Sequence, residues 1–375
     1  MKLAPLLTRY AASALLASAL FVSTSLRAEE TTSAASSWER DWQELQALKS
    51  KQPDRSLPPA QLYPAMSEQA RLVRMKAVSL FESNPKDPRR WEAAIEIMRG
   101  LSGFIYEVTG DFKTEGAKAF KVDRPVQAAW NAYTDAIYEG MLKDSDISTE
   151  NLKAGIEAYL YRLGMRQDLP LSATRVVIDE YTKRFPESDR LAGYEQRYYS
   201  SLLRNDSEAA NAHLQALIDS DNPSLKKLGE ALARTVIGTE LDLKFTAIDG
   251  REVDVSQMRG KVVLVDFWAT WCGPCIAELP NLKSVYDRYH DKGFEVIAIS
   301  LDSQRDRQKL LDFCKENNLP WPQHFDGKGW ANEFAEKYAI RGIPAMLLVD
   351  QDGRLVSTNA RGARLESEVK RLLNL

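Results

Sequence analysis

The sequence predicts an all-helical first half followed by an α/β domain, and three observations support this fold class. The chain has 375 residues, too many for one ordinary domain, and 44% of them are hydrophobic. Residues 38–236 show apolar side chains at helical spacing between Pro, Asp and Ser breaks, without a convincing strand. After about residue 237, short apolar runs alternate with helical patterns, which is typical of an α/β sandwich with a mixed sheet.

Composition excludes several classes of protein. Charged residues make up 27% of the chain and the formal net charge is −3, without a basic tract that would bind nucleic acid. Neither a disordered chain nor a polytopic membrane protein has this balance of residues. Three cysteines are too few for a disulfide scaffold, and three scattered histidines leave little for a metal site. We therefore expect no metal, no cofactor and no nucleic acid partner.

The first 28 residues have the pattern of a secretory signal peptide. Lys2 and Arg9 form a basic start, the run from Tyr10 to Ser25 is apolar, and Ala28 is a small residue at a suitable cleavage point. An uncleaved membrane anchor is the alternative, although the apolar run is short for a bilayer. The pattern predicts an exported protein, periplasmic in a bacterium.

The helices predicted for the first half alternate with breaks such as Phe185-Pro186 and Asn222-Pro223. In the helix 149–163 the apolar side chains form one stripe, and Thr149 is a suitable N-cap. The series resembles tetratricopeptide helical hairpins loosely, because the breaks are unevenly spaced. The expected bounds are Trp38–Lys51, Ser67–Asn84, Arg90–Ile105, Val126–Leu142, Thr149–Leu163, Ser172–Arg184, Arg190–Leu203, Ser207–Asp219 and Ser224–Val236.

Most tyrosines also lie in this half, among them Tyr159, Tyr161, Tyr198 and Tyr199. One interpretation is that they line a groove for a protein partner. Their helical spacing favours the other interpretation, in which they fill the contacts between helices. The half has no cysteine, no histidine pair and no glycine-rich loop. We therefore predict no chemistry there.

The second half opens with a hairpin, because Asp249-Gly250 separates two short strand patterns at 244–248 and 252–254. The apolar run 262–268 predicts a buried strand, and a long helix, 273–290, follows it. The remaining elements are expected in the order strand 294–300, helix 303–317, a loop with Trp321, helix 330–338, strand 345–350, strand 354–358 and helix 364–373.

The segment Trp271-Cys-Gly-Pro-Cys275 lies between the buried strand and the long helix. The free N–H groups and the positive end of the macrodipole at a helix N-terminus favour a thiolate at Cys272. The two-residue spacer brings the thiols close enough for an internal disulfide. Cys272, expected to be the exposed thiol, would attack a substrate disulfide, and Cys275 would resolve the mixed disulfide. One alternative is a zinc site, which would need two ligands besides these cysteines. The other alternative is a permanent structural disulfide between them.

The segment Val265-Asp-Phe-Trp-Ala-Thr-Trp-Cys-Gly-Pro-Cys275 resembles the active site of thioredoxin-fold proteins. The approach 244–261 and the insertion between Ile299 and Ile340 resemble the exported TlpA/ResA-type thiol:disulfide oxidoreductases of the redoxin branch. Pro280 matches the proline that kinks the active-site helix. The resemblance covers 238–375 and implies a thioredoxin-like domain there, after an all-helical domain at 38–236.

The same resemblance implies where substrate binds. Ile343-Pro344 matches the cis-proline loop, which in the family pairs with the substrate backbone. Together with Trp271, Gly273 and Pro274 beside the cysteines, this loop would form the substrate-binding surface.

Two acidic residues fit the chemistry. Asp266 occupies the family position of a buried carboxylate that relays a proton to or from Cys275, although many exported relatives carry Asn there. Glu278 matches a glutamate of the ResA-type branch that tunes the thiols. The alternatives are a strand-end residue facing solvent for Asp266 and an exposed helix residue for Glu278.

Cys314 shares a helical face with Leu310 and Leu311, so we interpret it as a small buried hydrophobic residue. The alternative is a second resolving thiol, as in a peroxiredoxin. A peroxidatic site places Thr three residues before its cysteine, where this chain has Ala269. A thiol peroxidase is therefore the weaker hypothesis.

The sequence thus predicts an exported enzyme that reduces disulfides in cysteine-containing envelope proteins. The Gly-Pro spacer favours a potential near the ~−270 mV of thioredoxin over a strongly oxidising ~−120 mV. Reduction in an oxidising compartment would need electrons from a membrane partner. The alternative is a binding protein whose helical half docks a client and whose redox domain serves that complex.

Overall fold

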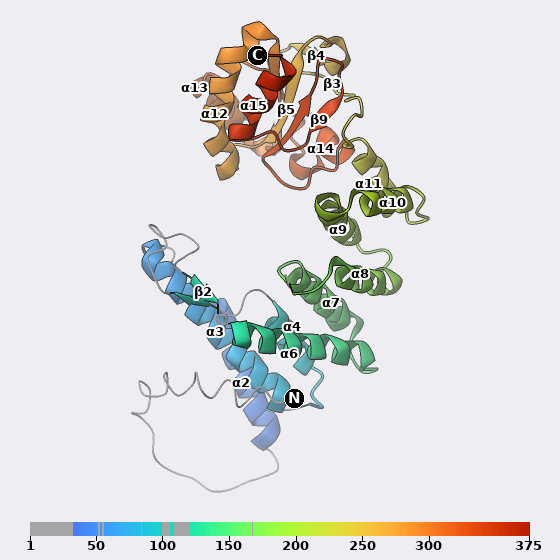
Figure 1. The fold of residues 1–375 in the computed structure, drawn as a ribbon. Coiled ribbons are helices and arrows are strands. Elements are labelled where there is room, and N and C mark those ends of the chain that lie inside the picture. The colour runs from blue at the N-terminus through green and yellow to red at the C-terminus, as the bar shows by residue number, and fades with distance from the viewer. Residues whose placement is uncertain are drawn as a thin grey trace. The chain divides into compact units, whose positions relative to one another are not determined.

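The computed structural model describes residues 33–51, 53–54, 56–83, 85–99, 106–108, 120–122, 124–166 and 168–375. The predicted signal peptide lies outside these residues. The chain forms two compact units, Met1–Tyr194 and Glu195–Leu375 (Figure 1). Within the described ranges, no helix has both the length and the apolar character that crossing a membrane requires.

The first unit consists mainly of helices, as predicted. They are α2 (Ser33–Ser50), α3 (Pro59–Ser83), α4 (Arg90–Met98), α6 (Arg124–Lys143), α7 (Thr149–Leu163), α8 (Leu171–Arg184) and the start of α9 (Leu191–Asn205). From α2 to α8, each described helix packs on the next, and α4 also packs on α7. Tyr159 of α7 is buried and stacks on Tyr138 of α6 with ring centroids 4.1 Å apart. These two tyrosines fill a contact between helices, whereas Tyr161 is exposed.

Several details of this unit differ from the sequence prediction. Ser148, not Thr149, caps α7, because its side chain accepts a hydrogen bond from the N–H of Asn151. The expectation of no strand is wrong, since β1 (Tyr106–Val108) and β2 (Phe120–Val122) pair antiparallel. The expected helix 90–105 is too long: α4 ends at Met98, and the next residue has extended backbone angles. Apolar spacing alone did not mark this end.

The second unit begins within α9 and includes α10 (Ser207–Ile218) and α11 (Pro223–Ala233). The side chain of Asn222 caps α11 by accepting hydrogen bonds from two N–H groups of its first turn. Gly229 lets α11 approach α10 closely: a Cβ at this position would lie 2.6 Å from the backbone nitrogen of Ile218. Although the sequence predicts that the α/β domain starts at 238, the compact unit that contains it extends back to Glu195.

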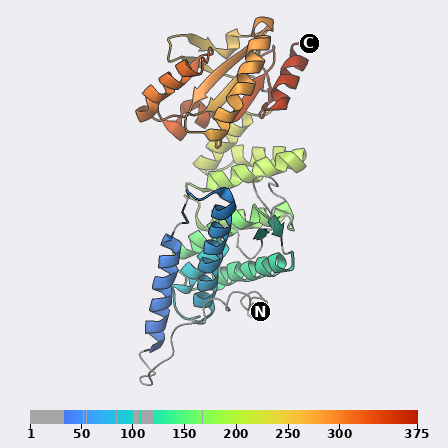
Figure 2. The ribbon, with the colours of Figure 1, turned by 90° about the vertical axis from the view of Figure 1, so that its left-hand side faces the viewer.

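The α/β part has a mixed five-stranded sheet in the order β7-β6-β5-β8-β9. Figures 1 and 2 show this sheet with helices beside it. Strands β5, β6 and β7 are parallel, and β8 and β9 run antiparallel to their neighbours. The strands are β3 (Lys244–Thr246), β4 (Glu252–Asp254), β5 (Val262–Trp268), β6 (Phe294–Ser300), β7 (Gln323–His324), β8 (Ala345–Val349) and β9 (Leu355–Ser357). The separate β3–β4 hairpin precedes the sheet. This topology is the thioredoxin fold, which confirms the predicted fold class.

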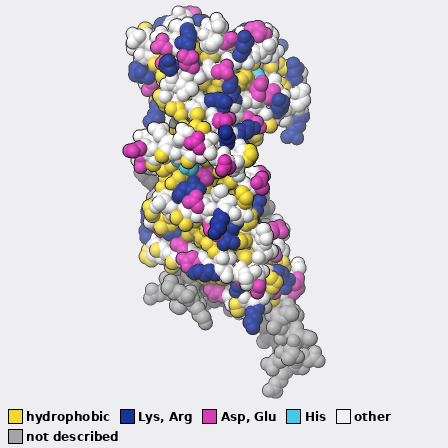
Figure 3. All heavy atoms as spheres, turned by 90° about the vertical axis from the view of Figure 1, so that its right-hand side faces the viewer, with side chains coloured by type: hydrophobic (Ala, Val, Ile, Leu, Met, Phe, Trp, Pro, Cys, Tyr) yellow, Lys and Arg dark blue, Asp and Glu magenta, His cyan; other side chains and the backbone are white. Residues whose placement is uncertain are grey.

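Four helices accompany the sheet: α12 (Gly273–Tyr289), α13 (Arg307–Glu316), α14 (Glu333–Lys337) and α15 (Ala363–Leu372). The helix expected at 330–338 begins later, because Asn332 is its cap and Trp330 lies in a preceding 3-10 turn. The two-residue strand β7 falls where the sequence indicated a loop, since so short a strand carries no periodicity. On the face shown in Figure 3, basic and acidic side chains of the described residues are interspersed.

Candidate active site

The two cysteines lie where the central strand passes into a helix. All seven residues of β5 are buried, and the chain then turns through Ala269 and Thr270 into α12. Cys272 is the N-cap of α12, and its Sγ accepts a hydrogen bond from the N–H of Cys275 at 3.2 Å. A disulfide joins Cys272 and Cys275, whose Cα atoms are 5.2 Å apart. Pro274 occupies the first turn, where its missing N–H costs no helical hydrogen bond.

Exposure does not distinguish the two cysteines in this disulfide form. Cys272 is 5% exposed and Cys275 is 3% exposed, because both side chains belong to the apolar core of the domain. The expectation that Cys272 is the exposed thiol is therefore not met. The two differ instead in position: the sulfur of Cys272 faces a backbone N–H at the positive end of α12.

Exposed apolar and small residues surround the buried disulfide. Trp271 is 48% exposed, and Ile276 in the next turn is 37% exposed. Trp330 is 46% exposed, and its ring centroid lies 6.1 Å from that of Trp271. Gly273 and Pro274 are exposed as well. Trp330 was not predicted as a site residue, because no sequence pattern marks it. Only the folded structure brings it close to Trp271.

Asp302 fixes the loop in front of the cysteines, and sequence reasoning missed it as well. Its carboxylate is fully buried and accepts hydrogen bonds from the N–H of Thr270 at 3.0 and 3.2 Å. The hydroxyls of Thr270 and Ser300 donate to it at 2.7 and 2.8 Å. Asp302 lies two residues after the end of β6, the parallel neighbour of β5. The sequence therefore held one signal: polar residues after adjacent parallel strands meet at one edge of a sheet.

Asp266 is buried within β5, which excludes the solvent-facing alternative. It is 3% exposed, and its Oδ1 atom has no hydrogen-bond partner among the described residues. Burial, helped by the negative charge of Glu278, raises the pKa of Asp266 to about 7. A carboxyl group with this pKa exchanges protons at neutral pH.

Glu278 connects two helices. Its Oε1 accepts hydrogen bonds from the N–H of Gly362 and from Nδ2 of Asn281, both at 2.7 Å. Gly362 is the N-cap of α15, so the glutamate ties the active-site helix α12 to the start of α15. The alternative of a freely exposed helix residue is therefore wrong, because Glu278 is half-buried and engaged. Its negative charge also contributes to the raised pKa of Asp266.

The Ile343–Pro344 peptide bond is cis, as the resemblance implied. The next residue, Ala345, opens β8 and pairs with Phe267 near the end of β5. The loop therefore lies beside the end of β5 that leads to Cys272. Ile343 and Pro344 are half-buried.

Cys314 is a half-buried free thiol on α13 that packs against the domain core. Burial, together with the negative charge of Asp302, raises the pKa of this thiol to about 12. A thiol with this pKa is protonated at neutral pH, which disfavours the second-resolving-thiol alternative. Across the described ranges, no group of three or more His, Cys, Asp or Glu residues is placed to hold a metal ion.

Comparison with known proteins places this site in a family. Residues 231–373 match the model of the Redoxin family. The chain is 30% identical over 128 residues to the thiol-disulfide oxidoreductase ResA of Bacillus thuringiensis subsp. konkukian, covering 34% of this chain and 70% of that protein. The chain belongs to the redoxin family of thiol-disulfide oxidoreductases. This redoxin is also 31% identical over 112 residues to sporulation thiol-disulfide oxidoreductase A of Bacillus subtilis, covering 30% of this chain and 66% of that protein.

Solved structures similar to this redoxin include the thioredoxin domain of a thiol-disulfide oxidoreductase from Bacteroides vulgatus. It is 30% identical, with a TM-score of 0.34, and the match covers 37% of this chain and 99% of that one. A thiol:disulfide interchange protein from Bacteroides sp. is 30% identical, with a TM-score of 0.33, 37% of this chain and 91% of that one being covered. The Redoxin match begins within α11 and leaves the earlier helices outside it.

Proposed function

We propose that this redoxin is an exported enzyme that reduces disulfides in other envelope proteins, with Cys272 as nucleophile and Cys275 as resolving thiol. The observation that supports this most is the Cys272–Cys275 disulfide at the N-terminus of α12, flanked by the exposed ring of Trp271. A permanent structural disulfide would not need exposed apolar residues beside it. A cycling pair needs them, because a client protein has to approach its sulfur atoms.

The reaction transfers two electrons from the dithiol to the client. The Cys272 thiolate attacks one sulfur of a client disulfide, forms a mixed disulfide and releases the other client sulfur as a thiolate, which takes up a proton. Cys275 then loses its proton and attacks the Sγ of Cys272. The Cys272–Cys275 disulfide forms, and the second client sulfur leaves as a thiolate and is protonated. The oxidised enzyme needs a dithiol donor, which we assign to a membrane partner.

Asp266 is the proton acceptor in the second step. A thiol buried in the core holds its proton tightly, and Cys275 has to lose that proton before it attacks. With its pKa near 7, a deprotonated Asp266 is a base of suitable strength at neutral pH. Glu278 helps to set that pKa and holds α12 in place.

Client binding uses the exposed surface around the disulfide. Trp271, Gly273 and Pro274 present it from the start of α12, and the Ile343–Pro344 loop pairs with the client backbone. Trp330 extends the same surface, because its ring lies against that of Trp271. Apolar residues next to the client cysteine would bury these rings and stabilise the mixed disulfide.

The basic and apolar pattern of residues 1–28 supports export of the protein. Two measurements test the proposed function. The first is the rate at which the reduced full-length protein reduces the disulfides of insulin, compared with a Cys272→Ser variant. The second is the equilibrium potential of Cys272/Cys275 against glutathione. No insulin reduction above the variant, together with a potential near ~−120 mV, would contradict a reducing role.

A further inference from the structure

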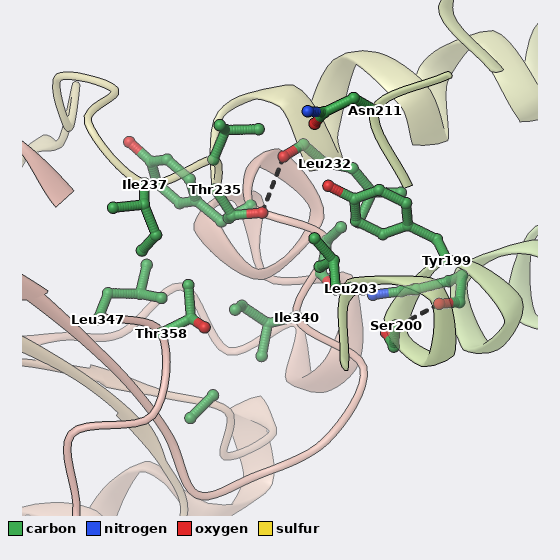
Figure 4. A pocket seen from close by; sticks show the side chains of 15 residues that line it. Tyr199, Ser200, Leu203, Asn211, Leu232, Thr235, Ile237, Ile340, Leu347 and Thr358 are labelled. Atoms are coloured by element: carbon green, nitrogen blue, oxygen red, sulfur yellow. Dashed lines mark hydrogen bonds between the residues drawn. The ribbon is translucent and has the colours of Figure 1, made fainter. Parts of the chain in front are cut away.

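Helices α9–α11 pack against the redoxin fold within the second compact unit, and a cavity of about 340 Å³ lies between them (Figure 4). Leu203 of α9 and Leu232 of α11 line the cavity from the helices, and Ile340 and Leu347 line it from the α/β part. Figure 4 shows these four side chains around the open space. The cavity interrupts the apolar contact between these helices and the α/β part. Individual polar contacts therefore contribute more to holding the two parts together.

One such contact comes from Gln196 of α9. Its Nε2 donates a hydrogen bond to the backbone oxygen of Ala339 at 2.6 Å. Ala339 follows α14 and has a φ of +53°, a left-handed conformation that residues with a Cβ adopt at a cost. A hydrogen bond to its carbonyl group helps to hold the backbone in this conformation. Nearby, Lys227 of α11 forms an ion pair with Glu336 of α14 at 2.8 Å.

Ala339 is the first residue of the segment that leads to the cis-proline. The N–H of Ile340 donates to the oxygen of Ala335 at 2.8 Å, which ties the start of the segment to α14. At the other end, Ala345 pairs with Phe267 of β5. Between these two attachments, Arg341 and Gly342 are exposed. The amide of Gln196 supplies a further attachment, from a helix far away in the sequence.

We propose that Gln196 is a positioning residue for disulfide exchange: it holds Ala339, and through it the Ile343–Pro344 loop, in the conformation that receives a client backbone. The inference rests on the proposed substrate-binding role of that loop. It gives α9–α11 a function in the reaction, because these helices then set the geometry of the client site without touching the cysteines.

The test compares two disulfide substrates in the full-length protein. Gln196→Leu keeps the size of the side chain and removes its hydrogen-bond donor. We expect the KM for insulin to rise about fivefold, the effect of one net hydrogen bond, with kcat nearly unchanged. Reduction of hydroxyethyl disulfide, which has no peptide backbone, should keep its wild-type rate. Amide hydrogen exchange in residues 340–343 should become faster in the variant.

Ser200→Ala is the matched control, because Ser200 lines the same cavity from the same helix, and its hydroxyl donates to the backbone oxygen of Gln196 and not to Ala339. It should leave both substrates and the exchange rates unchanged. Gln196→Met, which also lacks a donor, serves as the second variant if Gln196→Leu folds poorly. Wild-type exchange in 340–343, or equal slowing with both substrates, would overturn the inference. If wild-type protein does not reduce insulin, the proposed function fails, while the exchange data still decide whether Gln196 holds the segment.

Discussion

Asp302 accepts hydrogen bonds from both the backbone N–H and the hydroxyl of Thr270, two residues before Cys272. The carboxylate lies at the end of β6, is fully buried and also receives the hydroxyl of Ser300. Asp302 therefore attaches the backbone just before Trp271 and Cys272 to the end of the neighbouring strand β6.

We predict that Asp302→Ala lowers the free energy of unfolding by about 2–4 kcal/mol, because it leaves buried donors of Thr270 and Ser300 without a partner. Thr270→Val removes one donor and should cost about 1–2 kcal/mol. Both variants should also slow the attack by Cys272. Urea unfolding and stopped-flow mixing with insulin measure the two effects. Ser303→Ala is the control, because its hydroxyl bonds Asp306 and not Thr270. Wild-type kinetics in a folded Asp302→Ala protein would contradict the positioning role.

The attack order gives the second prediction. In a Cys314→Ala background, Cys272→Ser should abolish turnover, and Cys275→Ser should accumulate mixed disulfides with clients. The reason is position at the helix N-terminus and not exposure, since both cysteines are buried in the disulfide. Iodoacetamide applied to reduced protein at mildly acidic pH should label Cys272 first. Mass spectrometry that finds Cys275 labelled first would reverse the assignment.

How much of the site the sequence predicts depends on how far apart in the sequence the residues of each contact lie. The strands β5 and β6 have the predicted bounds, because a continuous apolar run between turns specifies a buried strand. The burial of Asp266 followed from Val265 and Phe267 beside it in the same run. The Asp302–Thr270 hydrogen bonds and the Trp271–Trp330 contact join residues of separate elements, so no local pattern encodes them. Packing of whole elements creates such contacts.

Trp330 offers a third prediction. Its side chain is 46% exposed, so Trp330→Ala should fold normally. Loss of its surface beside Trp271 should raise the KM for insulin about three- to tenfold, as expected for an aromatic contact residue at an interface. Val176→Ala removes an exposed apolar side chain from α8 and should have no effect. Steady-state kinetics with insulin check this, and an unchanged KM for Trp330→Ala would exclude the residue from the client surface.

Cys314 provides the fourth prediction. Cys314→Ala should keep insulin reduction within about twofold and cost at most about 1 kcal/mol of stability, because a small half-buried group is removed. Burial raises the pKa of the thiol to about 12, so alkylation of Cys314 in folded protein should be slow at pH 7 and increase with pH. A large loss of turnover in a folded variant would favour the peroxidase hypothesis again.

The last prediction concerns Asp266 and separates the two chemical steps. Asp266→Asn keeps the shape of the side chain but cannot accept a proton from Cys275. It should slow resolution of the mixed disulfide near neutral pH, while the first attack by Cys272 stays nearly unchanged. Stopped-flow kinetics of both steps between pH 5 and 9 measure this. Equal effects on both steps, or no effect on either, would mean that Asp266 is not the proton acceptor.

The same variant has a stability signature whose sign follows from the pKa. Burial raises the pKa of Asp266 to about 7, above the ~3.9 of an unfolded chain, so the folded protein binds the proton more tightly. The contribution of protonated Asp266 to stability is therefore fully present below about pH 4 and decreases as the pH rises to about 7, by up to about 4 kcal/mol for this shift. Asp266→Asn lacks this titration, so its stability relative to the wild type should increase from about pH 4 to about pH 7 and stay higher above pH 7. Amide exchange of the β5 backbone in oxidised protein, which reports opening of the sheet, would show it. Parallel pH profiles for the two proteins would mean that Asp266 is ionised at low pH in the folded state, and it would then be too weak a base for Cys275.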